Sequence, residues 1–259
     1  MGYKSLAQMP ARRNGPVSSN VRRRNMLRLK SLLTELRSKF PDDSYLKHHD
    51  LKIKESLVLR RLQGSYERVL ATLDDDAWRT LRKKSIRNFP LGQSIRGKQA
   101  LYDHLNEAFA YRFLLRSGCS NISFLDNAET LKKKGMHIKS PDLRFTQDGA
   151  VRYCEVKTIN ISNDQLAREI LSGVAHDSSI FELHEPFFAK FKDNVLKAIG
   201  QFESFGGSGI IYFLIHSDDR ALDDLEVNKV QIADFMNSYF PGVEMFVKFG
   251  IYGRFHLRV

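Results

Sequence analysis

The sequence has few of the features that would place a protein in a membrane or an oxidising compartment. No apolar run reaches about 18 uncharged residues, so we do not expect a membrane span. Residues 1–20 contain no apolar core of a secretory signal. The 2 cysteines, Cys119 and Cys154, cannot make a disulfide framework and fit a cytoplasmic protein. A glycine-rich phosphate loop is also lacking, so we do not expect this chain alone to use ATP.

Positive charge is abundant, and it is concentrated in the first part of the chain. Residues 1–100 contain 23 Lys+Arg and 9 Asp+Glu, a net charge of +14, whereas residues 101–259 contain 18 and 21, a net charge of −3. Such asymmetry favours a polyanionic partner, of which nucleic acid is the commonest. The alternatives are a solvated basic helical face or binding to anionic lipid.

Three regions are expected from composition and periodicity. Residues 1–20 are polar and basic, with Gly and Pro, and predict a disordered tail. Residues 21–95 predict a small basic helical region, because apolar residues recur at helical spacing before Pro41, from Leu59 onward and after Asp74. Residues 96–259 predict an α/β domain.

The order of elements predicts a mixed sheet for this α/β domain. The expected elements are a helix over 98–117, a strand near 122–125, a hairpin over 142–158, a helix over 186–205, a buried strand over 209–216, a helix over 225–240 and a strand over 243–249. Helices alternating with strands in this way are typical of layers of helix packed on a sheet.

The predicted hairpin brings two carboxylates together. Asp148-Gly149 favours a two-residue type I′ turn, which pairs Asp142 with Glu155. Lys157 lies two residues beyond Glu155 and therefore on the same strand face. Directly opposed like charges are unfavourable, and Mg²⁺ is held by one or two carboxylates with waters and phosphate oxygens. The pattern thus predicts a metal site; the alternative is an exposed hairpin with an ordinary Lys–Glu pair.

These residues resemble a known motif. Ser140-Pro141-Asp142, then twelve residues, then Glu155-Val156-Lys157 resembles the signature of the PD-(D/E)XK phosphodiesterases, the restriction-endonuclease-like superfamily. The order of elements over residues 98–216 resembles the αβββαβ core of that superfamily, which has a mixed central sheet. The resemblance implies a metal-dependent nuclease.

The resemblance also implies roles for individual residues. Asp142, Glu155 and the main-chain carbonyl of Val156 would hold Mg²⁺, for which Mn²⁺ could substitute. Lys157 would orient the attacking water or stabilise charge on the phosphate, and we favour this role over that of general base because two carboxylates keep it charged. Glu107 in the first helix would add a metal ligand; the alternative is a glutamate at the rim of a helix face.

Further polar residues are candidates for contacting nucleic acid. Gln201, Lys190 and Lys197 recur at helical spacing on one face of the helix over 186–205. Gln201 is a candidate for positioning water or phosphate, with a solvated face as the alternative. The other candidates are basic residues before the hairpin and near the N-terminus: Lys132, Lys133, Lys134, Arg22, Arg23 and Arg24.

Together these features predict a Mg²⁺-dependent nuclease that hydrolyses phosphodiester bonds in DNA, with basic N-terminal helices that help to hold the substrate. The main alternative is a nucleic-acid-binding or assembly module on the same fold, with weak or absent cleavage. The N-terminal helices are also candidates for a homodimer contact or for binding a protein partner.

Overall fold

A computed structural model describes residues 27–90, 99–126, 131–133, 136–159, 183, 185–215, 225–251 and 256–258. The tail expected over 1–20 and most of the linker expected around 87–97 lie outside these residues. None of the described helices is both long and apolar enough to cross a membrane.

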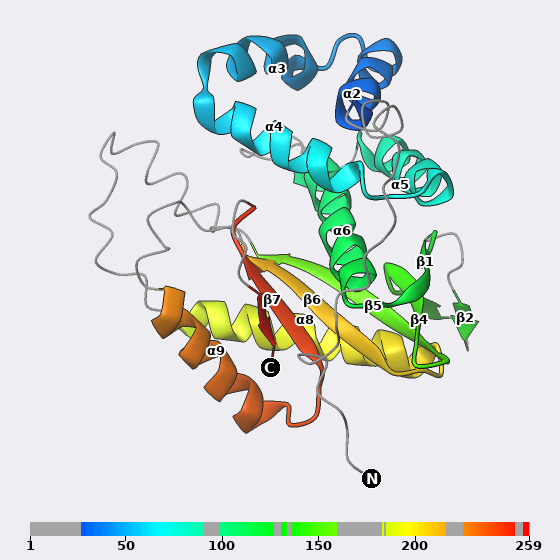
Figure 1. Cartoon of the computed structure of the whole chain (residues 1–259), viewed down its shortest axis with the longest axis vertical. Helices are drawn as coiled ribbons and strands as arrows, with labels where there is room; N and C mark the ends of the chain where they lie inside the picture. The colour runs from blue at the N-terminus through cyan, green and yellow to red at the C-terminus, as the bar shows by residue number, and fades with distance from the viewer. Residues whose placement is uncertain are drawn as a thin grey trace. The chain divides into compact units, whose positions relative to one another are not determined.

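The described chain is an α/β structure with a mixed sheet, as predicted (Figure 1). The helices are α2 (Arg28–Lys39), α3 (Ser44–Glu55), α4 (Leu57–Leu70), α5 (Asp75–Asn88), α6 (Gln99–Arg116), α8 (Glu185–Ser204) and α9 (Leu225–Tyr239). The strands are β1 (Ser120–Phe124), β2 (Leu131–Lys133), β3 (Met136–Ile138), β4 (Leu143–Gln147), β5 (Ala150–Ile159), β6 (Gly209–Ile215), β7 (Met245–Phe249) and β8 (His256–Arg258).

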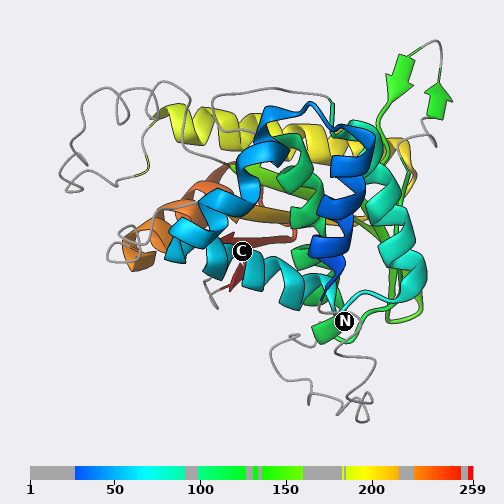
Figure 2. The ribbon, with the colours of Figure 1, turned by 90° about the horizontal axis from the view of Figure 1, so that it is seen from above.

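Six strands form one sheet in the order β1-β4-β5-β6-β7-β8. β1 pairs antiparallel with β4, β6 runs parallel to both β5 and β7, and β8 pairs antiparallel with β7. β2 and β3 form a separate antiparallel pair, visible as two short arrows in Figure 2. The sequence did not predict α3, the β2–β3 pair or β8.

The chain divides into two compact units, and this division differs from the predicted boundary between residues 95 and 96. The first unit contains residues 1–126 and 143–151, and the second contains residues 127–142 and 152–259. α6 belongs with the preceding helices because it packs against α4 and α5. The sequence-based prediction had instead grouped this helix with the later strands.

The first unit is organised around buried apolar helix faces and a buried polar anchor. Leu29, Leu32 and Leu36 of α2 are buried, in agreement with the predicted helical stripe. The buried Glu67 of α4 accepts hydrogen bonds from the main-chain nitrogens of Leu29 and Lys30, at 3.2 and 3.0 Å. This carboxylate satisfies donors that the first turn of a helix leaves unpaired, so it fixes α4 against the start of α2.

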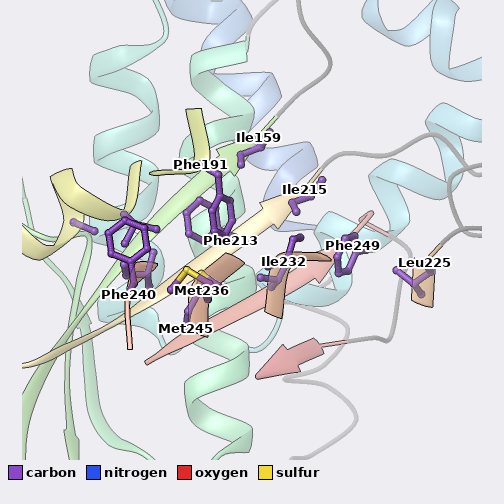
Figure 3. Close-up of a cluster of buried hydrophobic side chains, with 14 of the residues drawn as sticks. Ile159, Phe191, Phe213, Ile215, Leu225, Ile232, Met236, Phe240, Met245 and Phe249 are labelled. Atoms are coloured by element: carbon purple, nitrogen blue, oxygen red, sulfur yellow. The ribbon is translucent and has the colours of Figure 1, made fainter. Parts of the chain in front are cut away.

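The core of the second unit lies between α8, α9 and one face of β5, β6 and β7 (Figure 3). Phe191 of α8 stacks on Phe213 of β6, with ring centroids 4.3 Å apart. The continuous apolar run of β6 is buried almost throughout, as predicted for a central strand. Ile159 and Tyr153 of β5 belong to this same face.

Candidate metal centre

The hairpin turn is the one that the sequence predicted. Asp148 and Gly149 separate β4 from β5, with φ of 51° and 80°. Positive φ at both central residues is the requirement of a type I′ turn. The tight turn returns the chain along β4, and this brings the start of the hairpin next to the middle of β5.

Asp142 and Glu155 are both buried at this place. Asp142 immediately precedes β4 and is 3% exposed, whereas Glu155 lies in the middle of β5 and is 0% exposed. The Oδ2 atom of Asp142 accepts a hydrogen bond of 2.9 Å from the main-chain nitrogen of Val156. This bond fixes one oxygen of Asp142 on β5, beside Glu155.

Glu155 faces the core of the second unit and not open solvent. Side chains alternate along a strand, so Glu155 and Lys157 share the face of Tyr153 and Ile159, which packs under α8 and α9. Cys154 points the other way and is also buried. The carboxylate pair therefore lies at a buried, partly apolar place where electrostatic interactions are strong.

Two lysines surround the carboxylates. The ammonium of Lys157 donates to Glu155 Oε1 at 2.7 Å. The ammonium of Lys139 lies 3.6 Å from the same oxygen and 3.8 Å from Asp142 Oδ1. Lys139 was not predicted as a site residue, although its position three residues before Asp142 in the sequence is a signal for it.

The pKa of Glu155 is raised to about 7. Burial is the largest cause, and the negative charge of Asp142 adds to it, while Lys157 and Lys139 act in the opposite direction. Despite two lysines, the ionised carboxylate remains unfavourable at this place. A cation of higher charge, placed between the two carboxylates, would favour the ionised form.

Buried oxygens without a protein partner support this fit. Among the described residues, Glu155 Oε2, Ser140 Oγ and Gln201 Oε1 are buried and have no hydrogen-bond partner. Unsatisfied buried polar atoms are costly, and they are often explained by an ion or a water. The donor set of two carboxylates with neighbouring oxygens suits a hard cation such as Mg²⁺. No group of three His, Cys, Asp or Glu residues suited to a metal occurs in the described part of the chain, so the set is a pair.

Gln201 lies next to the loop that leads into Asp142. Its side-chain nitrogen donates to the carbonyls of Lys139 and Ser140, each at 3.3 Å. Of the helix residues predicted to act at the site, Gln201 is thus placed against the motif itself. Lys190 and Lys197 are exposed, and Lys197 pairs with Asp193 at 2.6 Å.

Glu107 belongs to the first unit and is not at the rim of a helix face, because it is 3% exposed. Its carboxylate pairs with the ammonium of Lys84 at 2.7 Å and with Nδ1 of His104 at 3.0 Å. These are the partners that a buried acid requires. The role of Glu107 as a metal ligand stays a prediction.

Several predicted nucleic-acid-binding residues lie outside the described side chains. Lys132 and Lys133 are placed only as main chain in β2. Lys134 and residues Arg22, Arg23 and Arg24 are outside the described residues.

Comparison with known protein families, with curated proteins and with solved structures finds no match for this chain in any of the three. The resemblance to the PD-(D/E)XK phosphodiesterases therefore depends on the motif and on the predicted order of elements.

Proposed function

We propose that this protein is a metal-dependent nuclease that hydrolyses phosphodiester bonds in DNA, with Asp142 and Glu155 as metal ligands. The observation that carries the proposal is the buried Glu155 carboxylate. One of its oxygens lacks a hydrogen-bond partner among the described residues, and Asp142 lies beside it. A carboxylate in this state suits a cation-binding site better than a purely structural ion pair.

The residues of the chain have separate tasks in this proposal. Asp142 and Glu155, with the main-chain carbonyl of Val156, would hold Mg²⁺ or Mn²⁺. A divalent cation supplies Lewis-acid polarisation of the phosphate and a bound water that ionises more readily. Lys157, already bonded to Glu155, would stabilise charge that builds up on the phosphate. Gln201 holds the loop that carries Asp142.

Exposed cations of the first unit support a polyanionic substrate. Lys30, Lys54, Arg60, Arg61 and Lys83 have exposed side chains. Arg28 and Lys84 of the same unit are buried and bonded within it. We therefore propose that only the exposed lysines and arginines of these helices contribute to DNA binding.

Cleavage assays with and without metal test the proposal. Plasmid, linear duplex, single-stranded DNA and RNA are incubated with Mg²⁺, Mn²⁺ or EDTA. We expect metal-dependent cleavage of DNA. Asp142→Asn and Glu155→Gln should lose both cleavage and metal binding. Lys157→Met should cleave about 10²–10³-fold more slowly but still bind the metal. Full activity of Glu155→Gln would refute the site.

One observation favours the alternative, a binding or assembly module without cleavage. Lys139 and Lys157 already place two positive charges beside the two carboxylates. In this alternative the ion pairs would serve to hold β5 and the loop before β4 together. Retained DNA binding with no cleavage under any metal would support this alternative.

A further inference from the structure

Lys139 is a cation that contacts both carboxylates and is not part of the motif. Its ammonium lies within 4 Å of Asp142 Oδ1 and Glu155 Oε1. Both carboxylates are metal ligands in the proposed function. The Glu155 carboxylate beside it is fully buried and has a second oxygen without a partner among the described residues.

The main chain at Lys139 and Ser140 is held by two hydrogen bonds, whereas the Lys139 side chain reaches the carboxylates from a partly exposed position. Gln201 binds the carbonyls of Lys139 and Ser140, and Ser140 is 0% exposed. The Lys139 side chain itself is 54% exposed. Lysine is a flexible stem with a compact charge at its end, so its ammonium can leave the carboxylates while the loop stays in place.

We propose that the Lys139 ammonium and a divalent cation exchange at the Asp142–Glu155 pair. This inference depends on the metal site of the proposed function. In the metal-free protein, Lys139 reduces the repulsion between the carboxylates. Two cations bound to the same pair of carboxylates would repel each other strongly at such short distance, so a metal that enters displaces the ammonium. Lys139 therefore sets the metal concentration at which the site fills.

Titration of metal-stripped protein with Mn²⁺, followed by calorimetry, tests the exchange. We expect Lys139→Met and Lys139→Gln to bind Mn²⁺ up to about fivefold more tightly than the unsubstituted protein, the scale of a partly exposed ion pair. Lys139→Arg keeps the charge and should bind much like the unsubstituted protein. Lys197→Met is the matched control, because it removes an exposed lysine that pairs with Asp193 elsewhere in the same unit, and its affinity should not change.

A second readout separates exchange from a general effect of charge. A lysine-selective acylating reagent modifies free amines, and mass spectrometry follows the rate at Lys139. This rate should rise when Mn²⁺ is added to the unsubstituted protein, and it should not rise in Glu155→Gln. A rate that Mn²⁺ leaves unchanged overturns the exchange.

The outcomes also separate this inference from the proposed function. Mn²⁺ binding that requires Glu155 but is equal or weaker in both neutral Lys139 variants overturns the exchange and leaves the metal site intact. No binding in any variant overturns both. Tighter binding in the neutral variants, with no cleavage of any nucleic acid, supports the exchange and refutes the nuclease.

Discussion

Glu155 is a carboxylate without exposure to water, next to a second carboxylate. Because burial and Asp142 raise its pKa to about 7 from an ordinary value of 4.5, the folded protein takes up a proton that the unfolded chain does not take up in this window. Stability in the absence of metal is therefore greatest below about pH 4.5 as far as this group is concerned. It falls as pH rises from about 4.5 to about 7.

We predict that Glu155→Gln removes this fall. In EDTA, the unfolding free energy of the variant minus that of the unsubstituted protein should increase by about 2–3 kcal/mol from pH 5 to pH 8, since each pKa unit corresponds to about 1.4 kcal/mol. Urea unfolding at the two pH values measures the difference. Adding Ca²⁺ should reduce the gain, because the metal stabilises the ionised carboxylates. Parallel pH profiles for the two proteins would contradict the prediction.

The Lys84–Glu107 pair in the first unit is a buried ion pair, with side chains 1% and 4% exposed. We predict that Lys84→Met destabilises the protein by about 3–5 kcal/mol, because the buried Glu107 carboxylate loses the neighbouring ammonium that compensates its charge. Replacing both residues, as Lys84→Met with Glu107→Leu, should cost less than Lys84→Met alone. Chemical denaturation measures both losses. Lys83→Met, the exposed neighbour, is the control and should change stability by less than about 0.5 kcal/mol.

At the scale of elements, the approach of α8 to β6 depends on glycine. A Cβ at Gly209 would lie 2.5 Å from ring atoms of Phe202, and one at Gly207 would lie 2.7 Å from the ring of Tyr153. These rings belong to or border the core of the second unit. The close contact explains why the start of β6 carries glycine, whereas large apolar residues fill the rest of it.

We therefore predict that Gly209→Ala destabilises the protein by about 1–3 kcal/mol, the cost of overpacking. Gly200→Ala in α8 is the matched control, because nothing lies within 4 Å of its added Cβ. That control should be stabilised by about 0.5–1 kcal/mol through helix propensity. Thermal unfolding of the two variants compares them directly. Equal shifts would mean that the Phe202 ring moves aside freely.

For the whole molecule, the exposed cations of the first unit can be tested only while that unit is intact. Removal of residues 1–95 would break the Lys84–Glu107 pair and the bond of 2.8 Å between Tyr66 and Asn106. It would also remove α4 and α5, which pack against α6. Substitutions of exposed charges are therefore the better experiment.

We predict that neutralising Arg60, Arg61 and Lys83 together reduces the log–log salt slope of duplex binding by about 0.9 for each phosphate that the variant no longer neutralises. The measurement is DNA affinity against salt concentration in Ca²⁺. Arg79→Gln, which removes an exposed arginine paired with Asp76 at 2.8 Å, should leave the slope nearly unchanged. An unchanged slope in the triple variant would assign these helices to another task, such as binding a partner.

The hairpin, the buried strand and the long helices could be predicted from the sequence alone. Local chemistry decides these elements: the Asp148-Gly149 turn, the apolar run of β6, and the glycines that end α8. Because a two-residue turn fixes what lies across a hairpin, the sequence also placed Asp142 near Glu155. The short strands could not be predicted. β2, β3 and β8 have only three residues each, which is too few to show an alternation of apolar and polar residues.

Tertiary structure decided what surrounds these residues. The burial of Glu155, the anchoring of the loop by Gln201 and the ion pair between Glu107 and Lys84 depend on residues that are far apart in the chain. The place of α6 in the first unit was decided in the same way. Hydrophobic periodicity records that a face is buried but not which partner covers it. The electrostatic state of the site, and the approach of Lys139 to both carboxylates, therefore followed only from the folded arrangement.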